Sequence, residues 1–472
     1  MPGISNFAST HRDLVSIALY VALLIVGWLL QYSTAGGETI SEIFQFEQVQ
    51  FAKHSVWVLG ALFIFWLIQF IPRRIWGSLS WIFYVLSLLL LFLVLLMGSD
   101  VKGAQSWIKL GGLSVQPSEL AKLSTFLVLS TFLSNISVNV TTNYNRVVAN
   151  TIILIPLLLI LLQPDAGSAL VFLASFLVLF REGYSPLPLY FAVSLAFIFI
   201  LTIKFSVVLV LLLLVVLYDI ILLNKARQAE NIFLIYTVFV ACSLVAAYYG
   251  FAQLMLYIHL VIALVGTAYL AFRQKESLFV IIMVAGLAFY ALVSTSIEYM
   301  FRNILKPHQQ ERILVWLDPS SGDPRGSLYN VLQSKMAIGS GQMTGKGYLE
   351  AYMTKLDYIP EQNTDFVFSA LSEQFGFIGA SFVLMLFLGL LLRLLYLAEK
   401  QKSRFSRIFM LCVACCFFTH LFINVGMTMG LVPVIGIPLP FLSYGGTAMM
   451  SFSIMLAICV AIDDSRETAH EI

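Results

Sequence analysis

Residues 78–98 read SLSWIFYVLSLLLLFLVLLMG, an apolar run without a charged residue. About 20 such residues form a helix long enough to cross the hydrocarbon core of a bilayer. The whole chain has this character, since 60% of its 472 residues are hydrophobic and 11% are charged, whereas soluble domains carry roughly 25% charged residues. The composition excludes a soluble protein, and the sequence has no basic tail that would favour nucleic-acid binding. It predicts an all-α integral membrane protein that crosses the bilayer many times.

Further apolar runs of this kind bring the expected number of transmembrane helices to about fourteen. They lie near residues 14–33, 52–71, 119–135, 148–163, 165–180, 187–203, 205–223, 231–250, 254–272, 278–297, 364–398, 405–430 and 441–462. All five cysteines lie inside such runs, so a disulfide framework is not expected. The CxxC spacing of Cys412 and Cys415 falls in the middle of a run, and we expect no metal or redox role there.

The distribution of Lys and Arg predicts the orientation in the membrane. With a cytoplasmic N-terminus, the short loops on the outer side receive little beyond Lys102, Lys109 and Lys204. Cytoplasmic loops are enriched in Lys and Arg, so both termini are expected in the cytoplasm. The cytoplasmic side would then carry Arg12, Arg73, Arg74, Arg146, Arg181, Lys225, Arg227, Arg273, Lys275, Arg393, Lys400, Lys402, Arg404, Arg407 and Arg466.

The runs divide the chain into four parts. Residues 1–186 and 364–472 supply the N-terminal and C-terminal helices, residues 187–297 form an expanded transmembrane segment, and residues 298–363 form a long outer loop. The loop is rich in Gly, Pro and charged residues, but it also contains Trp316, Tyr329, Tyr348, Tyr352 and Tyr358, so we expect it to be ordered. Long loops are translocated regardless of their charge and are usually functional. The chemistry of the protein is therefore expected on the outer face.

Charged side chains at membrane depth are functional candidates by default. One run begins with QPSE at residues 116–119 and reaches Lys122, which lies on the same helical face as Glu119. The two residues either form a mutual salt bridge, or Lys122 binds an anionic group while Glu119 orients it. Another run begins with QPD at residues 163–165. The helix dipole favours the carboxylate of Asp165 at this position, and a capping role is the simpler interpretation.

The long loop ends with PEQNTDF at residues 360–366, which places Asp365 at the start of an apolar helix. Ser369, Ser372 and Glu373 follow at i+4, i+7 and i+8, so a polar stripe continues down one face of this helix. A helix cap, worth about 1 kcal/mol, would account for Asp365 alone. The stripe favours a functional site, because unpaired polar groups inside a membrane are costly.

Two glycine-rich stretches add to this pattern. Residues 339–347, GSGQMTGKG, fail the GxxxxGK[ST] spacing of a P-loop, but a turn of this kind beside Lys346 can still hold a phosphate through backbone N–H groups. Residues 430–446 contain three prolines and four glycines. They predict a broken helix that is buried in protein or lines a cavity. His259 and His420 lie inside apolar runs and are expected to be hydrogen-bonded core histidines.

Together these motifs resemble the SEDS family (shape, elongation, division and sporulation proteins), most closely its RodA, or elongation, branch. They occur in the family's order and cover nearly the whole chain outside 187–297. The residues that carry the resemblance are Gln116-Pro117-Ser118-Glu119 with Lys122, Gln163-Pro164-Asp165, Arg312 with Trp316-Leu317-Asp318-Pro319, Gln333-Ser334-Lys335, the turn from Gly339 to Gly347, Pro360-Glu361 with Thr364-Asp365-Phe366, Gly376-Phe377-Ile378-Gly379, and Pro438-Leu439-Pro440 with Ser443-Tyr444-Gly445-Gly446.

The chain departs from the family pattern in several places. The family has ten spans, so the excess of about four spans falls in 187–297. Ser106 stands before Trp107 where Arg is usual, Gln342 replaces a usual Gly, and Asn363 stands where His is common.

The resemblance implies peptidoglycan glycosyltransfer on the outer face of the cytoplasmic membrane, with lipid II as the substrate. The family's proposed catalytic residue falls on Asp365, which would act as general base on the acceptor's 4-hydroxyl. The departing diphosphate needs cations, and the resemblance leaves a divalent ion, Mg²⁺ or Mn²⁺, open without requiring a cofactor. The other candidate site residues are Lys122, Glu119, Arg312, Lys335 and Lys346 for the substrate and its diphosphate, and Asp165, Gln116, Ser443, Gly445 and Pro440 for the cavity.

Other interpretations remain open at this point. A transporter that flips lipid II would also use intramembrane charges and broken helices, but it would often show two similar halves, which the sequence lacks. A division-specific polymerase of the FtsW branch and a scaffold without activity are further alternatives. By resemblance, a class B penicillin-binding protein would bind the chain and supply the transpeptidase. MreC, MreD and RodZ are further expected associates, and membrane lipids surround the protein.

Overall fold

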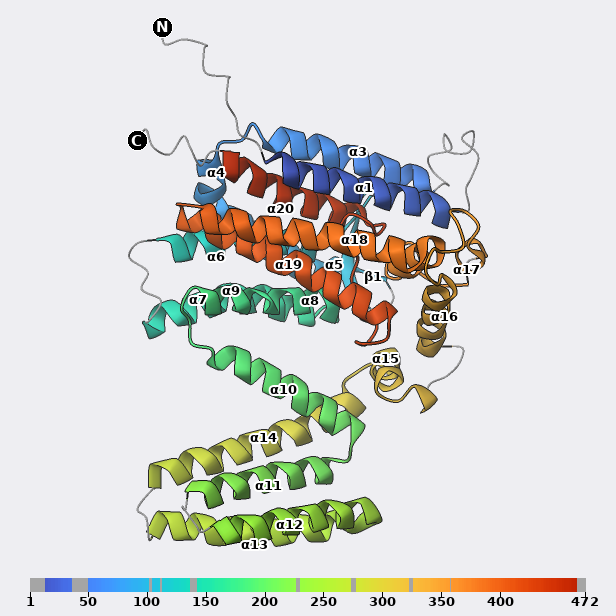
Figure 1. The fold of residues 1–472 in the computed structure, drawn as a ribbon. Coiled ribbons are helices and arrows are strands. Elements are labelled where there is room, and N and C mark those ends of the chain that lie inside the picture. The colour runs from blue at the N-terminus through green and yellow to red at the C-terminus, as the bar shows by residue number, and fades with distance from the viewer. Residues whose placement is uncertain are drawn as a thin grey trace. The chain divides into compact units, whose positions relative to one another are not determined.

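A computed structural model describes residues 13–35, 50–101, 104–110, 113–135, 142–225, 230–272, 277–321, 326–356 and 358–464. The chain forms two compact units (Figure 1). Unit 1 combines Met1–Pro186 with Asp323–Ile472, and unit 2 is Leu187–Gly322. The segment expected as a long outer loop, 298–363, therefore contributes to both units, and much of it is helical.

Unit 1 contains most of the helices and a small antiparallel sheet in which the strand order is β1-β2-β3. Its strands are β1 (Ser99–Val101), β2 (Ala104–Leu110) and β3 (Leu113–Val115). Its helices are α1 (Leu14–Thr34), α3 (Gln50–Ile68), α4 (Arg73–Ser78), α5 (Ser80–Met97), α6 (Pro117–Ser134), α7 (Asn143–Leu161), α8 (Ala166–Leu173), α9 (Ser175–Arg181), α16 (Ser327–Ser340), α17 (Tyr352–Lys355), α18 (Val367–Lys400), α19 (Arg404–Thr428) and α20 (Gly446–Asp464).

Unit 2 consists of helices alone in its described residues. They are α10 (Leu187–Lys204), α11 (Val207–Lys225), α12 (Glu230–Ala246), a π-helical turn (Ala247–Phe251), α13 (Ala252–Phe272), α14 (Ser277–Asn303), α15 (Pro307–Leu317) and a 3₁₀ turn (Pro319–Ser321). Helices α12 and α13 form a hairpin, because the chain turns at Gly250, where φ is 97°. The hairpin brings the hydroxyl of Tyr236 within 3.2 Å of Nδ1 of His259.

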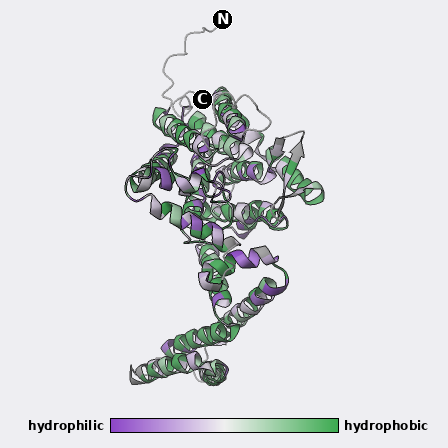
Figure 2. Ribbon diagram, turned by 90° about the vertical axis from the view of Figure 1, so that its right-hand side faces the viewer, coloured by the Kyte–Doolittle hydropathy of each residue, from purple (hydrophilic) through white to green (hydrophobic). Residues whose placement is uncertain are grey.

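The chain is an integral membrane protein, and hydrophobic residues run along the helices of both units (Figure 2). All of the predicted spans are helical, although only 11 stretches in the described residues are long and apolar enough to cross a membrane. The expected number was about fourteen, and three features explain the difference. Helix α6 carries many polar residues, the run 166–181 is divided into α8 and α9, and 235–272 is one apolar stretch although it folds as a hairpin.

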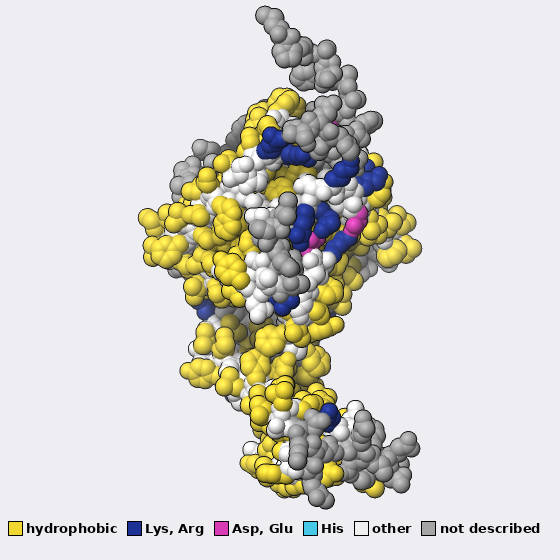
Figure 3. All heavy atoms as spheres, turned by 90° about the vertical axis from the view of Figure 1, so that its left-hand side faces the viewer, with side chains coloured by type: hydrophobic (Ala, Val, Ile, Leu, Met, Phe, Trp, Pro, Cys, Tyr) yellow, Lys and Arg dark blue, Asp and Glu magenta, His cyan; other side chains and the backbone are white. Residues whose placement is uncertain are grey.

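One end of unit 1 gathers basic side chains, and we call it the basic end. The guanidinium of Arg393 near the end of α18 binds Asp13, which precedes α1. At the start of α19, Arg404 and Arg407 bind Glu182, which follows α9. Lys and Arg side chains are concentrated on this face of the unit (Figure 3). The start of α1, the ends of α9 and α18 and the start of α19 therefore lie together.

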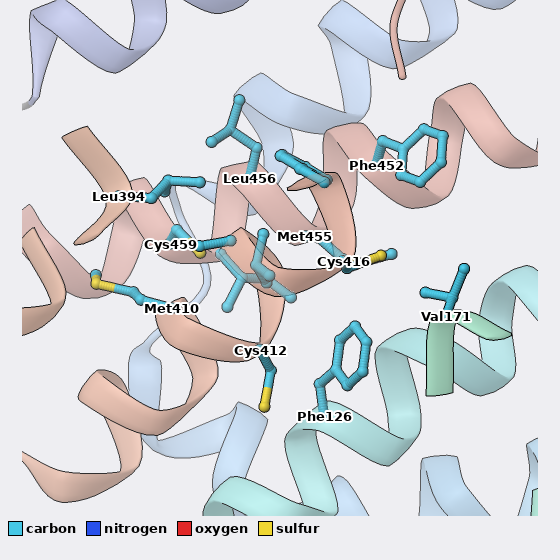
Figure 4. Packing of buried hydrophobic residues seen from close by; sticks show 14 of the residues in the cluster. Phe126, Val171, Leu394, Met410, Cys412, Cys416, Phe452, Met455, Leu456 and Cys459 are labelled. Atoms are coloured by element: carbon cyan, nitrogen blue, oxygen red, sulfur yellow. The ribbon is translucent and has the colours of Figure 1, made fainter. Parts of the chain in front are cut away.

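The core of unit 1 lies where α6, α18, α19 and α20 pack together (Figure 4). Phe126 of α6, Leu394 of α18 and Leu456 of α20 are at most 1% exposed. Cys412 and Cys416 of α19 lie among them. All five cysteines are free thiols. Within the described residues, no group of three or more His, Cys, Asp or Glu side chains could hold a metal ion.

Candidate active site

Asp365 lies immediately before α18, in a tight turn. Glu361 adopts a positive φ of 63°, and its carbonyl accepts hydrogen bonds from the backbone N–H groups of Thr364, Asp365 and Phe366 at 3.1, 3.1 and 3.2 Å. The N-cap of α18 is Phe366. Asp365 therefore stands one residue before the capping position, and the turn presents its half-buried side chain outside the helix.

The broken segment 430–445 forms the surroundings of Asp365. It is non-helical, as expected from its prolines and glycines. A Cβ atom at Gly436 would lie 3.2 Å from Oδ2 of Asp365, so the backbone of the segment packs directly against the carboxylate. Gly436 also has a φ of 76°, a conformation that favours glycine. These two requirements fix the residue type at this position.

The end of the broken segment that precedes α20 is tied to the turn before α18 and to α1. The hydroxyl of Ser443 donates to the carbonyl of Thr364 at 2.5 Å and accepts from the N–H of Leu439 at 2.8 Å. Gln31 of α1 donates from Nε2 to the carbonyls of Asn363 and Leu442 at 2.8 and 3.0 Å. Pro440 is buried within the segment, and Gly445 precedes α20. Ser443 and Pro440 therefore shape the surroundings of Asp365.

Lys122 forms a buried cluster with Glu119 and His420. Its Nζ lies 2.8 Å from Oε1 of Glu119 and 3.0 Å from Nε2 of His420, and its side chain has no exposed surface. The predicted mutual salt bridge is present. The second oxygen of the Glu119 carboxylate, Oε2, is buried without a hydrogen-bond partner. In this structure Lys122 therefore contacts protein groups and no solvent.

Gln116 and Asp165 join the starts of two helices. Oδ1 of Asp165 accepts from the N–H of Ser168 at 3.0 Å, which caps α8, and Oδ2 accepts from Nε2 of Gln116 at 3.0 Å. Gln116 is itself the N-cap residue of α6. A Cβ at Gly167 would lie 3.0 Å from the side chain of Ile437, so this pair of helix starts packs against the broken segment.

Lys335 is an exposed cation on α16 near the same segment. Its Nζ lies 2.6 Å from where a Cβ at Gly430 would be. The adjacent hydroxyl of Ser334 pairs with that of Ser369 at 2.6 Å. Ser369 lies one helical turn beyond Asp365, so the hydrogen bond brings this part of α16 close to the start of α18.

The comparisons with known proteins identify this arrangement. The family model described as "Cell cycle protein", which covers FtsW, RodA and SpoVE, matches residues 14–219 and 206–468. The chain belongs to this family, the SEDS proteins.

Individual SEDS relatives match over almost the whole chain. The peptidoglycan glycosyltransferase RodA of Treponema pallidum is 32% identical over 98% of this chain and 98% of its own. MrdB of Escherichia coli K12, also a peptidoglycan glycosyltransferase, is 27% identical over 97% of this chain and 95% of its own. FtsW proteins, such as the probable glycosyltransferase of Buchnera aphidicola from Schizaphis graminum at 25% identity, match as well.

Solved structures of SEDS proteins share the fold. A structure described as the structural coordination of polymerization and crosslinking by a peptidoglycan synthase complex matches with a TM-score of 0.62 and 25% identity, covering 97% of this chain and 98% of its own. The crystal structure of the rod shape determining protein RodA of Thermus thermophilus matches with a TM-score of 0.56 and 22% identity, over 97% of this chain and 98% of its own.

The glycine-rich turn of this SEDS protein packs against α18. The backbone N–H groups of Lys346 and Gly347 donate to the carbonyls of Glu373 and Gln374 at 3.0 and 3.1 Å, where α18 is broken at Gly376. The N–H of Gly345 donates within the turn. These three donors bond to protein carbonyls in this structure, and phosphate binding by the turn stays a prediction.

Lys346 and Arg312, two further predicted cations, have other neighbours than Lys335. Nζ of Lys346 lies 3.5 Å from Oε1 of the buried Glu373, whose carboxylate also accepts the N–H groups of Met353 and Thr354 at the start of α17. Arg312 lies on α15 in unit 2. Their predicted contact with the diphosphate stays a prediction.

Two departures from the family pattern have structural consequences. Gln342 replaces the usual glycine and adopts a φ of 48°, a conformation that glycine adopts at less cost. Asn363 precedes Thr364 and donates from Nδ2 to the side chain of Gln50 at 3.1 Å. Ser106, the third departure, is buried in β2.

Sequence reasoning missed a polar face on α19. His420, Asn424 and Thr428 are spaced four residues apart and are buried. Nδ2 of Asn424 donates to the carbonyls of Asp365 and Ile437 at 2.9 and 2.7 Å, and the carbonyl of Thr428 accepts from Ser334 at 2.7 Å. The spacing of these polar residues within an apolar helix was the available signal.

Proposed function

We propose that the chain polymerises lipid II into glycan strands during cell elongation. The placement of Asp365 carries the proposal: a half-buried carboxylate held outside the start of α18, against the broken segment of a SEDS protein. The names of the RodA and MrdB relatives support the activity and favour the elongation branch over the FtsW branch.

In the proposed reaction Asp365 acts as the general base. It accepts the proton of the acceptor sugar's 4-hydroxyl while that oxygen bonds to the anomeric carbon of the donor. The bond from the anomeric carbon to the diphosphate breaks with inversion, and the electron pair leaves with the polyprenyl diphosphate. Cations stabilise the charge that develops on this leaving group.

Among the predicted cations, Lys335 is best suited to hold the diphosphate. It is exposed, and its neighbour Ser334 bonds one turn from Asp365. Lys122 is buried in its cluster and contributes through its protein contacts. Arg312 and Lys346 are further proposed ligands, and a divalent cation, Mg²⁺ or Mn²⁺, would share this role if one binds with the substrate.

The proposed orientation places the basic end in the cytoplasm, because loops on that side are enriched in Lys and Arg. Helix α1 starts at the basic end, and Gln401 at that end bonds Asp463 near the end of α20 at 2.8 Å. Both termini would therefore be cytoplasmic. Asp365 precedes α18, whose other end is basic, so the active site would open to the outer face.

We also propose a class B penicillin-binding protein as the partner that supplies crosslinking. The likeness to a protein from a peptidoglycan synthase complex that coordinates polymerization and crosslinking supports this pairing. MreC, MreD and RodZ are further proposed associates, by family resemblance.

The decisive experiment mixes the purified protein in detergent with lipid II, with and without a class B penicillin-binding protein, and follows glycan chain formation. Asp365→Asn should lower polymerisation by about 10²–10⁴-fold, the contribution of a general base, without changing expression. Glu350→Gln alters an exposed carboxylate elsewhere in unit 1 and should leave polymerisation unchanged.

Retained activity in Asp365→Asn would remove this residue from the mechanism. No polymer from the wild type, even with the partner present, would contradict the glycosyltransferase. It would favour the lipid II transporter instead, which a lipid-flipping assay would then test.

A further inference from the structure

His420 connects the buried cation Lys122 to the segment that packs against Asp365. It lies on α19 and is 1% exposed. Its Nε2 lies 3.0 Å from Nζ of Lys122, and its Nδ1 lies 3.0 Å from the carbonyl oxygen of Pro438. The imidazole therefore bridges α6 and the broken segment, and both of its nitrogens are engaged.

The partners of His420 determine its protonation. The carbonyl of Pro438 can only accept, so Nδ1 must carry the proton. The ammonium of Lys122 has only N–H donors, so Nε2 must offer its lone pair. His420 is therefore a neutral imidazole with its proton on Nδ1.

The bond to Pro438 lies near the point at which the segment packs against Asp365. Gly436, two residues earlier, packs against the carboxylate. Between them, the carbonyl of Ile437 accepts from Asn424, whose Nδ2 also donates to the backbone carbonyl of Asp365. His420 and Asn424, one turn apart on α19, thus hold successive carbonyls of residues 437 and 438.

We propose that His420 is a positioning residue for the reaction. Its Nδ1–H bond to Pro438 fixes residues 436–438, and these residues fix the carboxylate of Asp365 against the acceptor hydroxyl. The inference rests on the proposed role of Asp365 as general base. A small displacement of a catalytic group is sufficient to slow a reaction, since an error of about 1 Å can cost 10²-fold.

Two amide substitutions separate the two bonds of His420. The Nδ2 of an asparagine lies near the place of histidine Nδ1, so His420→Asn keeps a donor for Pro438 and loses the contact with Lys122. A glutamine reaches the place of Nε2, so His420→Gln keeps an acceptor for Lys122 and loses the bond to Pro438. Both variants remain polar and uncharged, so they are matched to each other.

The measurement is kcat and KM for lipid II polymerisation, together with thermal unfolding in detergent. His420→Gln should lower kcat about tenfold with KM within about twofold, whereas His420→Asn should keep kcat within about threefold. Equal losses of kcat in both variants, or a loss confined to His420→Asn, would overturn the proposal. So would an unchanged kcat in His420→Gln.

A control in unit 2 tests whether any buried histidine has the same effect. His259→Gln removes hydrogen bonds of a fully buried imidazole in unit 2 and should leave kcat unchanged. A tenfold loss in this variant would contradict the specific role of His420. Asp365→Asn is assayed alongside to separate the two proposals. If Asp365→Asn is active, the proposed function fails. If Asp365→Asn is inactive while both His420 variants match the wild type, only the inference about His420 fails.

Discussion

Each unit of the molecule buries a carboxylate beside a histidine, but the two clusters are connected differently. In unit 1, Lys122 bonds both Glu119 and His420. His420 in turn donates to the carbonyl of Pro438, which lies outside the helices in the broken segment. In unit 2, Asp219 of α11 binds His259 of α13 at 2.9 Å, and every further bond of this cluster stays within helices.

The unit 2 cluster is closed by two residues of α12. Tyr236 donates its hydroxyl to Oδ2 of Asp219 at 2.9 Å. Ser243 lies 3.2 Å from Nε2 of His259 and donates its own proton to the carbonyl of Phe239. Nε2 must therefore donate to Ser243, and one proton lies between Nδ1 and Oδ2 of Asp219.

All bonds of His259 therefore stay among the side chains of three helices, whereas His420 also bonds the backbone of the broken segment. The same residue type thus serves two purposes. In unit 2 histidine joins three helices through a closed hydrogen-bond cluster, and in unit 1 it joins α6 and α19 to the broken segment beside the candidate active site. Polar contacts of this kind commonly hold membrane helices together.

The largest effect is expected when the unit 1 cluster is broken by Lys122→Ala. The change leaves the buried carboxylate of Glu119 without its cation, and removing one partner of a buried pair costs about 3–5 kcal/mol. Thermal unfolding in detergent should show this loss, and polymerisation should fall with it.

The double variant Glu119→Gln/Lys122→Met controls for the buried charge. It should recover most of the stability, because no uncompensated charge remains. If it also recovers full polymerisation, Glu119 and Lys122 would matter for folding alone, and the connection to the active site would rest on the bond of His420 to Pro438.

A smaller effect is expected when the unit 2 cluster is weakened by Asp219→Asn. The side-chain amide can still bond to Tyr236 and His259, so the cost should be about 1–3 kcal/mol, the range for one impaired buried hydrogen bond. We expect a lower unfolding temperature with unchanged kcat for the folded protein. A kcat that drops as far as in His420→Gln would show that unit 2 is coupled to catalysis.

The smallest effect concerns the ion pair of Asp13 with Arg393 at the basic end. Burial raises the pKa of Asp13, but hydrogen bonds from Arg393 and Ser16 outweigh it and hold the pKa below the ordinary value of 3.8. The pair should therefore stabilise the protein fully above that value, and this contribution should be lost as the pH falls through the lowered pKa.

The Asp13→Asn variant tests whether the stabilisation by the ion pair is lost at acidic pH. Arg393 is 30% exposed, so solvent screens the pair and the loss at neutral pH should be about 1 kcal/mol or less. The difference in unfolding temperature between the variant and the wild type should shrink at acidic pH. A difference that stays constant between pH 7 and pH 3 would assign the effect to packing and exclude the charge.

The helices could be predicted from the sequence because each apolar run is a local property of the chain. The salt bridge of Glu119 with Lys122 and the cap at Asp165 were also predictable, since their partners lie three residues away. The role of His420 could not be predicted, because its partners lie on α6 and in the broken segment. Its expected status as a hydrogen-bonded core residue is confirmed.

Long-range packing also explains what the sequence left unpredicted. The break of α18 at Gly376 exposes carbonyls of Glu373 and Gln374, which accept N–H groups of the turn 339–347. Such a break within an apolar helix leaves little trace in the sequence. The added helices of unit 2 were recognised as an excess, but the pairing of Asp219 with His259 depends on the packing of α11 against α13.

The free cysteines give this protein a practical advantage. All five thiols lie within helices that are built for the membrane. A water-soluble maleimide has poor access to such positions, so the wild-type chain should give little background labelling. A single cysteine introduced in an exposed loop could then be labelled from one side of intact cells, and the sidedness of each loop could be mapped without first removing the native thiols.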